Sequence, residues 1–215
     1  SRWAIAAIAL TVWVSGGGSP IVAQQEPSPA QLQLDLDRLR AQIAAARIGA
    51  ERFVELIDRY GLGTVEAACD HLMDYSERVM RTAIETLPDG VYRAKTFIDG
   101  YLDSDDPSRG DLPIEVTVTV NGGDITVDFT GTAAQVPDRP INMPLKGTTD
   151  CAVWLTIRSI LLDSAIHGHI PQNSGLTRPI HIVAPSGTLV NPIFPAPTIA
   201  RFCTGNQAAD TLMKA

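Results

Sequence analysis

The segment Ile114–Thr130, IEVTVTVNGGDITVDFT, decides the fold that the sequence predicts. Apolar and polar residues alternate over 114–120, and they alternate again over 124–130, after the residues Asn-Gly-Gly. A period of two places successive side chains on opposite faces of a strand, and Asn-Gly favours a tight hairpin turn. The sequence therefore predicts a β-hairpin with its turn at 121–123. The run at 91–102 is expected to form a third strand beside it.

Upstream of the hairpin, the spacing of apolar residues changes to three and four. One face of an amphipathic helix is predicted within 35–61, formed by Leu36, Leu39, Ile43, Ala46, Ala50, Phe53, Leu56 and Tyr60. Gly61 and Gly63 are expected to end this helix, and Thr64 to cap a second helix that continues to the Pro-Asp-Gly turn at 88–90. Because the connection is short, the two helices are predicted to pack as an antiparallel hairpin.

Downstream of the β-hairpin, a long irregular segment leads to a helix predicted at 151–163, capped by Thr148, Thr149 or Asp150. Its almost continuous apolar sequence predicts burial on most sides. The segment Ile170–Arg201 follows with six prolines. It is expected to contain an edge strand at 178–185, because Pro179 limits where that strand can begin, and then a turn at 185–189.

The predicted fold class is therefore α+β. Its parts are a helical hairpin, an antiparallel β-hairpin or sheet, a buried helix and a Pro-rich loop–strand–loop segment. Two regions are expected: residues 1–34 as an atypical apolar N-terminus with a Gly/Pro linker, and residues 35–215 as the main domain. The apolar run Trp3–Val14 is shorter than the roughly 20 residues of a membrane-spanning helix. It fits an export signal, a buried helix or strand, or a non-native start.

Charge and cysteine content exclude several classes of protein. The 215 residues carry a formal net charge of -7 and no basic cluster, which argues against a nucleic-acid partner. Cys69, Cys151 and Cys203 are far apart and form no Cys-x-x-Cys pair, so neither a zinc knuckle nor a disulfide framework is predicted. Buried, reduced thiols in a cytoplasmic protein are expected instead.

No motif assigns catalytic residues. The sequence lacks a Gly-x-Ser-x-Gly elbow, a phosphate loop and dinucleotide-binding glycines. His167 and His169 form a His-x-His pair that could bind zinc on a strand, but Gly and Pro bound this loop and no acidic residue follows closely. No metal site is therefore predicted.

Three polar residues on irregular backbone are candidates for substrate binding: Asn142, Asn173 and Arg178. An amide offers a donor and an acceptor together, which suits recognition of amides and carbonyls. An Arg can pair with a carboxylate or phosphate through two hydrogen bonds. Two other interpretations are open from the sequence alone: each Asn could cap a turn, and Arg178 could pair with Asp138 or another acid of a loop.

Four stretches together resemble one family. They are Ile170–Pro197, with its Pro-x-Asn-x-Gly-x-x-Arg-Pro core and Asn-Pro-Ile-Phe-Pro-Ala-Pro end, and the stretches 35–61, 75–92 and 125–142. In this order they are similar to the B-type subunit of the hydantoinase/oxoprolinase family, over roughly residues 35 to 212.

The resemblance implies an α+β subunit of enzymes that open cyclic amides with ATP, such as hydantoins, 5-oxoproline or lactams. It implies a hetero-oligomer in which an A-type subunit holds ATP-Mg and phosphorylates the substrate oxygen. Hydrolysis is then completed on the B-type subunit, often with a divalent metal. Related members carboxylate ketones. The family is cytoplasmic.

The chain also departs from the family pattern. The family's metal ligands are expected among His and Asp residues upstream of the first helix, yet residues 1–31 contain neither. The family continues beyond this C-terminus. A middle fragment is therefore expected, without its own cofactor and catalytically incomplete. Three hypotheses follow: part of a cyclic-amide hydrolase, part of a ketone carboxylase, or a remnant that only associates with a partner subunit.

Overall fold

The computed structural model describes residues 27–100 and 110–215, which fall into two compact units divided between Arg59 and Tyr60. The apolar run Trp3–Val14 lies outside the described residues, as do the last two residues of the strand predicted at 91–102. The predicted domain boundary at residue 34 stays a prediction.

The helix α1 (Pro29–Tyr60) makes up the first unit as far as Arg59, and it confirms the amphipathic helix predicted within 35–61. The second unit begins with α2 (Leu62–Ile84). Gly61 separates the two with a φ of 82°, a left-handed conformation that favours glycine. Thr64 lies inside α2, so the predicted cap at Thr64 is wrong: the helix begins directly after the glycine. The predicted packing of the two helices stays a prediction.

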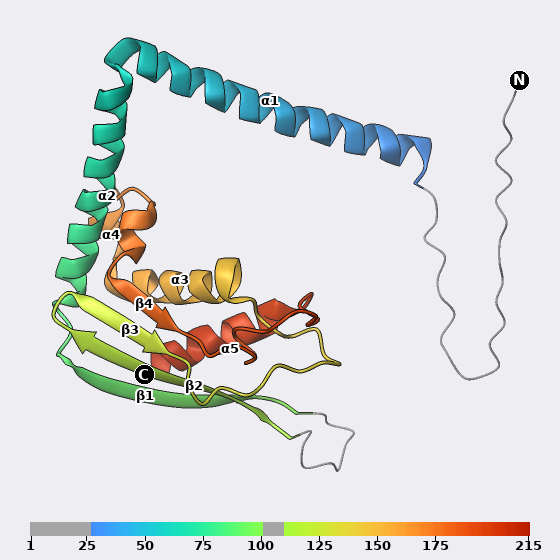
Figure 1. Ribbon diagram of the computed structural model, residues 1–215, viewed down its shortest axis with the longest axis vertical. Helices are drawn as coiled ribbons and strands as arrows, with labels where there is room; N and C mark the ends of the chain where they lie inside the picture. Colours follow the sequence, from blue (N-terminus) through green and yellow to red (C-terminus); the bar gives the residue numbers. More distant parts are fainter. Residues whose placement is uncertain (1–26, 101–109) are drawn as a thin grey trace, which may run out of the picture. The chain divides into compact units, whose positions relative to one another are not determined.

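The sheet has four strands in the order β1-β2-β3-β4 (Figure 1). They are β1 (Gly90–Ile98), β2 (Leu112–Asn121), β3 (Asp124–Asp128) and β4 (Ile180–Val183). The antiparallel pair β2–β3 confirms the predicted hairpin, with Asn121 opposite Asp124 and Gly122 at φ 56° in the turn. The antiparallel pair β1–β2 confirms the third strand as far as Ile98.

The fourth strand makes the sheet mixed. β4 is parallel to β3, so the expectation of an antiparallel sheet is corrected at this edge. A parallel neighbour requires a crossover, and the chain between β3 and β4 supplies one that includes α3 (Asp150–Leu161) and α4 (Ser164–His167). Pro179 directly precedes this edge strand, as the sequence predicts.

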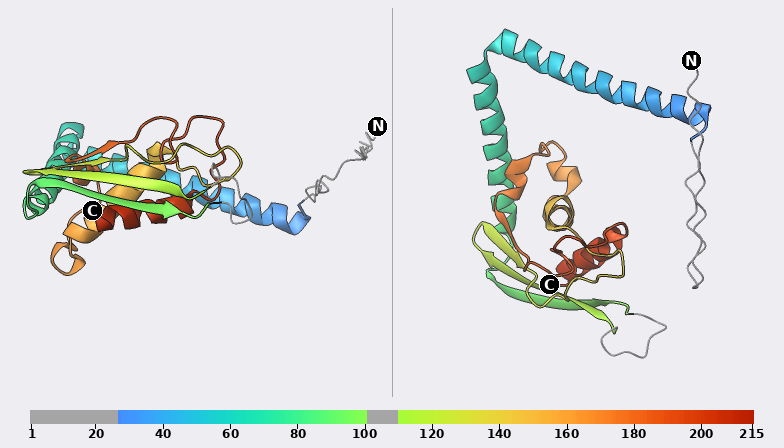
Figure 2. Two further views of the ribbon diagram at one scale, coloured as in Figure 1. Left: turned by 90° about the horizontal axis from the view of Figure 1, so that it is seen from below. Right: turned by 45° about the vertical axis from the view of Figure 1, so that its right-hand side comes forward.

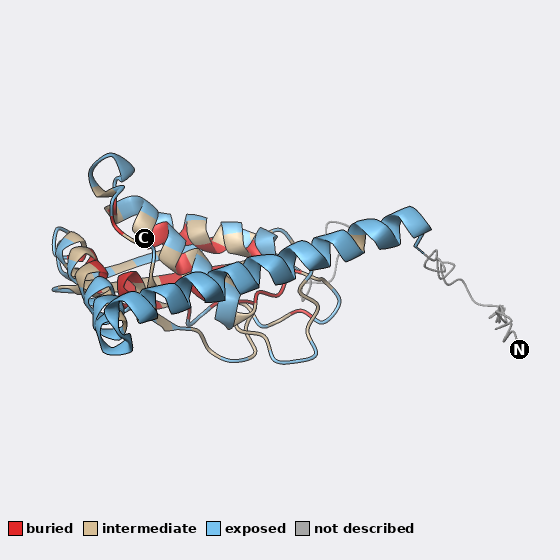
Figure 3. Ribbon diagram, turned by 90° about the horizontal axis from the view of Figure 1, so that it is seen from above, coloured by how far each residue is buried: buried red, intermediate tan, exposed pale blue. Residues whose placement is uncertain are grey.

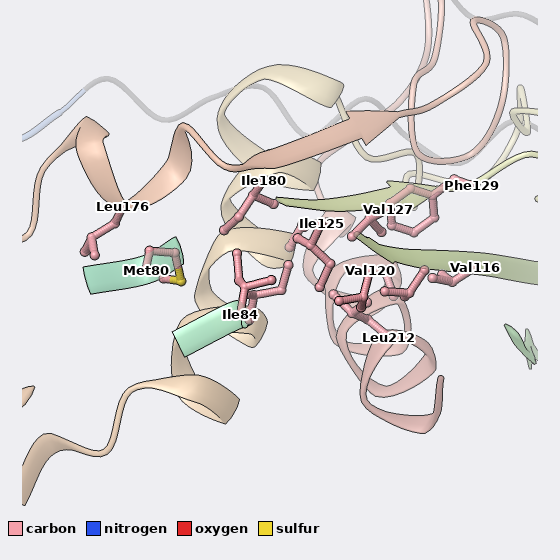
Figure 4. Close-up of a cluster of buried hydrophobic side chains, with 14 of the residues drawn as sticks. Met80, Ile84, Val116, Val120, Ile125, Val127, Phe129, Leu176, Ile180 and Leu212 are labelled. Carbon is pink, nitrogen blue, oxygen red and sulfur yellow. The ribbon is translucent and has the colours of Figure 1, made fainter. Parts of the chain in front are cut away.

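The core lies on one face of the sheet, where α2, α3 and α5 (Arg201–Lys214) meet it (Figures 1 and 2). Figure 4 shows Met80 and Ile84 of α2 converging with strand side chains and with Leu212 of α5. Val116, Val127 and Phe129 have at most 1% of their surface exposed. Burial of each such side chain stabilises the fold by about 1.5–3 kcal/mol.

Helix α3 is buried on one side only, which corrects the predicted burial on most sides. Val153 and Ile157 are buried, whereas Leu155 is 65% and Ile160 53% exposed. With 3.6 residues per turn, only one stripe of α3 can face the sheet and α5. Asp150, one of the three predicted capping residues, accepts hydrogen bonds from the backbone N–H groups of Gly147 (2.8 Å) and Cys151 (2.7 Å).

The three cysteines are free and exposed, so their predicted burial is wrong. Cys69 lies in the first half of α2, and the buried residues of that helix begin only at Ser76. The turn predicted at 185–189 is confirmed, with Gly187 at φ 82°. Within the described ranges, no helix combines the length and the apolar character needed to cross a membrane.

Candidate functional site

The Pro-rich segment binds the middle of α2, and Asn173 is the first contact. Its Oδ1 accepts a hydrogen bond from the backbone N–H of Gly175 at 2.9 Å, which caps the 3-10 turn η3 (Ser174–Thr177). Its Nδ2 donates to the carbonyl oxygen of Leu72 on α2 at 3.3 Å. The amide therefore closes a local turn and also ties that turn to α2.

Arg178 is the second contact of this segment with α2. Its Nη1 lies 2.8 Å from a carboxylate oxygen of Asp74 and 2.9 Å from one of Glu77. These two acids belong to α2, so Arg178 pairs with helix acids and not with the loop acid Asp138 that the sequence offered. The hydrogen bond from Arg178 and a second one from Arg81 hold the pKa of Glu77 below its ordinary value.

The ion pairs continue from α2 to the sheet. Arg81 donates to Glu77 at 2.9 Å and to Asp124 at 2.7 Å, and His181 of β4 lies 3.2 Å from Asp124. Burial raises the pKa of Asp124, but the hydrogen bonds from His181 and Arg81 outweigh it and lower that pKa overall. This chain of charges joins α2, β3 and the Pro-rich segment.

Gly175 lets the segment approach α2 closely. It is buried, and a Cβ atom added there would overlap the carbonyl oxygen of Met73. Backbone atoms cannot move aside as a flexible side chain can, so only glycine fits this contact. The path of the segment past α2 therefore depends on Gly175 as well as on Asn173 and Arg178.

Asn142 lies in a different part of the unit. Its side chain is fully buried; its Oδ1 accepts from the N–H of Val136 at 2.8 Å, and its Nδ2 donates to the carbonyl oxygens of Val136 (2.7 Å) and Pro197 (2.9 Å). It thus joins the loop after the hairpin to the end of the Pro-rich segment. Its hydrogen-bond partners among the described residues include neither Asn173 nor Arg178, and substrate binding by these three residues stays a prediction.

A cleft of about 510 Å³ lies beside Asn173, between α3, Met80 of α2 and the segment 172–177. Trp154 and Arg158 of α3 line it, one helical turn apart. The Nε1 of Trp154 and the Nε of Arg158 are buried and have no hydrogen-bond partner among the described residues. Arg158 also forms no ion pair with any carboxylate of residues 27–100 and 110–215.

Such a cleft suits a ligand with an apolar body and an acceptor or anionic group. Sequence reasoning missed it, because the apolar pattern of 151–163 predicted only a buried helix. The available signal was a single Arg four residues after a Trp inside that apolar run. The tertiary structure was needed to place these residues opposite Asn173.

A second cleft of about 470 Å³ brings His167 and His169 together with Tyr75 of α2. The hydroxyl of Tyr75 lies 3.2 Å from the Nε2 of His169. Over residues 27–100 and 110–215, no three His, Cys, Asp or Glu side chains gather as a metal would require. The described side chains thus do not fit a divalent metal by themselves.

The sequence profile of the family described as hydantoinase B/oxoprolinase matches residues 21–215. The chain belongs to this family. This confirms the resemblance found in the Pro-rich segment and the three other stretches.

Individual relatives agree with this assignment. Over 177 residues the chain is 68% identical to a protein assigned as the B subunit of a D-/L-hydantoinase from Pseudomonas sp. strain NS671, a match that covers 82% of this chain and 30% of that relative. The beta subunit of caprolactamase from Pseudomonas jessenii is 32% identical over 164 residues, covering 75% of this chain and 26% of the relative. The chain thus spans about a third or less of the curated relatives' length.

Solved structures share the fold. The crystal structure of ATP-dependent caprolactamase from Pseudomonas jessenii matches with a TM-score of 0.63 and 27% identity, over 80% of this chain and 30% of that chain. A nucleotide-free acetone carboxylase structure also gives a TM-score of 0.63, at 18% identity, over 80% of this chain and 22% of that chain. The second likeness concerns the fold alone.

Proposed function

We propose that this chain is part of the B-type subunit of an ATP-dependent enzyme that opens cyclic amides of the hydantoin class. The observation that carries the proposal is the 68% identity to a hydantoinase B subunit over 177 residues. That match covers 82% of the chain. A shared fold alone would not decide the function. The proposal therefore rests on sequence identity over most of the chain and not on the fold.

In the proposed reaction an A-type partner would bind ATP-Mg and transfer the γ-phosphoryl group to the substrate oxygen, with ADP leaving, which makes the carbonyl carbon more electrophilic. One water would then supply a hydroxyl to that carbon, the ring C–N bond would break, and the ring nitrogen would receive a proton. A second water would cleave the resulting acyl phosphate, which yields the carboxylate and inorganic phosphate. The sequence of this chain contains no phosphate loop, which supports placing ATP on the partner. The described residues do not fit a divalent metal by themselves.

We place the complex in the cytoplasm, where ATP is available and where free thiols stay reduced. All three cysteines of the chain are free. The partner is proposed to be an A-type subunit in a hetero-oligomer, in keeping with relatives whose own names describe them as one subunit of an enzyme.

Within the chain, the cleft beside Asn173 is the proposed contact surface for substrate. Arg158 would donate to an oxygen of the cyclic amide or of its phosphorylated form, and Trp154 would cover its apolar part. Asn173 and Arg178 would hold the opposite wall of the cleft in place, because both bind α2. Asn142 would fix the loop that follows the hairpin.

The test uses the gene product that contains this chain, purified together with its A-type subunit. Hydantoin turnover would be followed by release of the ring-opened N-carbamoyl amino acid and of ADP. The expected result is product formation that requires ATP and both subunits. Bicarbonate-dependent carboxylation of a ketone would replace this proposal with the carboxylase hypothesis. A stable complex without any ATP-linked turnover would support the association-only hypothesis.

The cleft is tested with Arg158→Gln in the same complex. Loss of a hydrogen bond from a charged group costs about 1.5–3 kcal/mol, so the KM for the cyclic amide should rise on the order of tenfold or more. The matched control is Arg93→Gln on the exposed face of β1, which should leave KM unchanged. Equal kinetics for the two variants would remove Arg158 from the site.

A further inference from the structure

Helix α1 carries an apolar stripe that no other described residue of its own unit covers. None of its residues is buried, and Figure 3 shows the helix exposed along its length. The side chains of Leu39 and Ile43 are each 55% exposed, and that of Phe53 is 49% exposed. Most of the stability of a helix in a protein comes from packing of its apolar face. A 32-residue helix with this face in water therefore points to a partner surface.

The stripe repeats every seven residues without interruption. One set of positions, seven residues apart, contains Leu36, Ile43, Ala50 and Ile57. The other set contains Leu32, Leu39, Ala46 and Phe53. Each of these four residues lies four positions before a member of the first set. A strict seven-residue repeat of this kind is the seam of a left-handed coiled coil, since a straight helix drifts away from it by about 20° per repeat.

We propose that α1 pairs with α1 of a second copy of this chain as a parallel, in-register two-stranded coiled coil. The residue types of the seam favour that form. Ile43 and Ile57 are β-branched at the first seam position, and Leu32 and Leu39 occupy the second, which is the combination preferred by parallel dimers. This inference does not depend on the proposed reaction.

The charges beside the seam favour the parallel orientation. In a parallel pair, Asp35 of one helix lies across from Arg40 of the other, and the two-fold symmetry repeats this contact. In an antiparallel pair that matches Ala46 with Ala50, each Arg47 lies across from the Arg47 of the second copy. Like charges in that position weaken the pair, whereas opposite charges strengthen it.

The chain's own α2 is too short to cover this seam. The seam runs from Leu32 to Ile57, or about 38 Å at 1.5 Å per residue. The Pro-rich segment already contacts α2 from Leu72 onward, so the uncommitted part of α2 is 62–71, or about 14 Å. A second copy of α1 offers a seam of equal length and matching residues.

The first test measures the mass of the full chain by sedimentation equilibrium at micromolar concentrations. We expect a dimer, and Ile43→Glu should weaken self-association on the order of a hundredfold, because two carboxylates would be desolvated in one layer. The matched control is Ile48→Glu. Ile48 is 57% exposed but lies outside the seam, so this variant should stay dimeric. Far-ultraviolet circular dichroism reports whether both variants keep their helices.

The second test fixes the orientation. In a chain with Cys69, Cys151 and Cys203 replaced by Ser, Ala46→Cys should form a disulfide between copies. Asp35→Arg should weaken the dimer, and the added change Arg40→Asp should restore it.

The proposal would be overturned if the full chain did not self-associate. The seam would then be covered by α2 or by an A-type subunit and not by a second copy. Equal effects of Ile43→Glu and Ile48→Glu would also overturn it. A dimer without the Ala46→Cys disulfide and without rescue by the charge exchange would reject the parallel arrangement.

Discussion

The hairpin β2–β3 and the Pro-rich segment Ile170–Arg201 are both ordered parts of one unit, yet different interactions hold them. The hairpin has a regular backbone ladder and an alternating row of buried side chains. The segment contains only one short strand, and side-chain hydrogen bonds to backbone groups hold much of the rest. Asn191, for example, donates to the carbonyl oxygen of Ala184 at 2.7 Å.

This difference determines how each region should respond to substitution. In the hairpin, the cost of a change should follow the apolar area that it removes from the core. In the Pro-rich segment and the loop it contacts, the cost should follow the single polar atom or the single glycine that is lost. Exposed residues of the same types provide the controls, and free energies of unfolding are the quantity to compare.

The largest effect is expected for Phe129→Ala at the end of the hairpin. Phe129 is fully buried, so the variant should lose about 3–5 kcal/mol of stability in chemical denaturation. Phe97→Ala, at a residue that is 50% exposed on the same sheet, should lose much less. Similar losses for the two variants would show that burial does not control the stability of this region.

Asn142→Ala should come next, at about 2–3 kcal/mol. It leaves the N–H of Val136 and the carbonyl of Pro197 without their buried partner. Asn206 on α5 is exposed, and Asn206→Ala should change stability by less than about 0.5 kcal/mol. A small loss for Asn142→Ala would mean that water replaces the amide and that the loop is held by other contacts.

Gly175→Ala should cost about 1–3 kcal/mol, because the new methyl group overlaps the backbone of Met73. Gly63→Ala is the control: nothing lies within 4 Å of a Cβ at Gly63, and alanine favours a helix. Thermal melting should therefore show opposite signs for the two variants. A stabilised Gly175→Ala variant would contradict the close approach of the segment to α2.

The smallest effect concerns pH. The pKa of Glu77 lies below its ordinary value of 4.5 in the folded chain, so the carboxylate stabilises the fold above that pH. This contribution is lost as the pH falls through the lowered pKa, and because the pair is partly exposed it should stay below about 1 kcal/mol. Glu77→Gln should make the free energy of unfolding depend less on pH in this acid range. An unchanged curve would show that the ion pairs with Arg178 and Arg81 contribute nothing measurable.

The sequence was sufficient for elements whose signal is local. The alternation of 114–130 predicted the hairpin and its turn, and the three-and-four spacing before Gly61 predicted α1. Strand and helix periods are properties of neighbouring residues, which is why they can be recognised without a structure. The four linked stretches also placed the chain in its family, since their order and residue types are specific.

The remaining features depend on residues far apart in the chain. The parallel pairing of β4, the exposed side of α3, the acids that bind Arg178 and the cleft that contains Arg158 all arise from such contacts. The sequence around an Arg is the same whether its side chain binds a substrate or, as for Arg178, a helix acid 101 residues away. Local sequence patterns thus revealed which segments form helices and strands. The packing of the second unit determined which polar side chains already have hydrogen-bond partners within the chain and which could still bind a ligand.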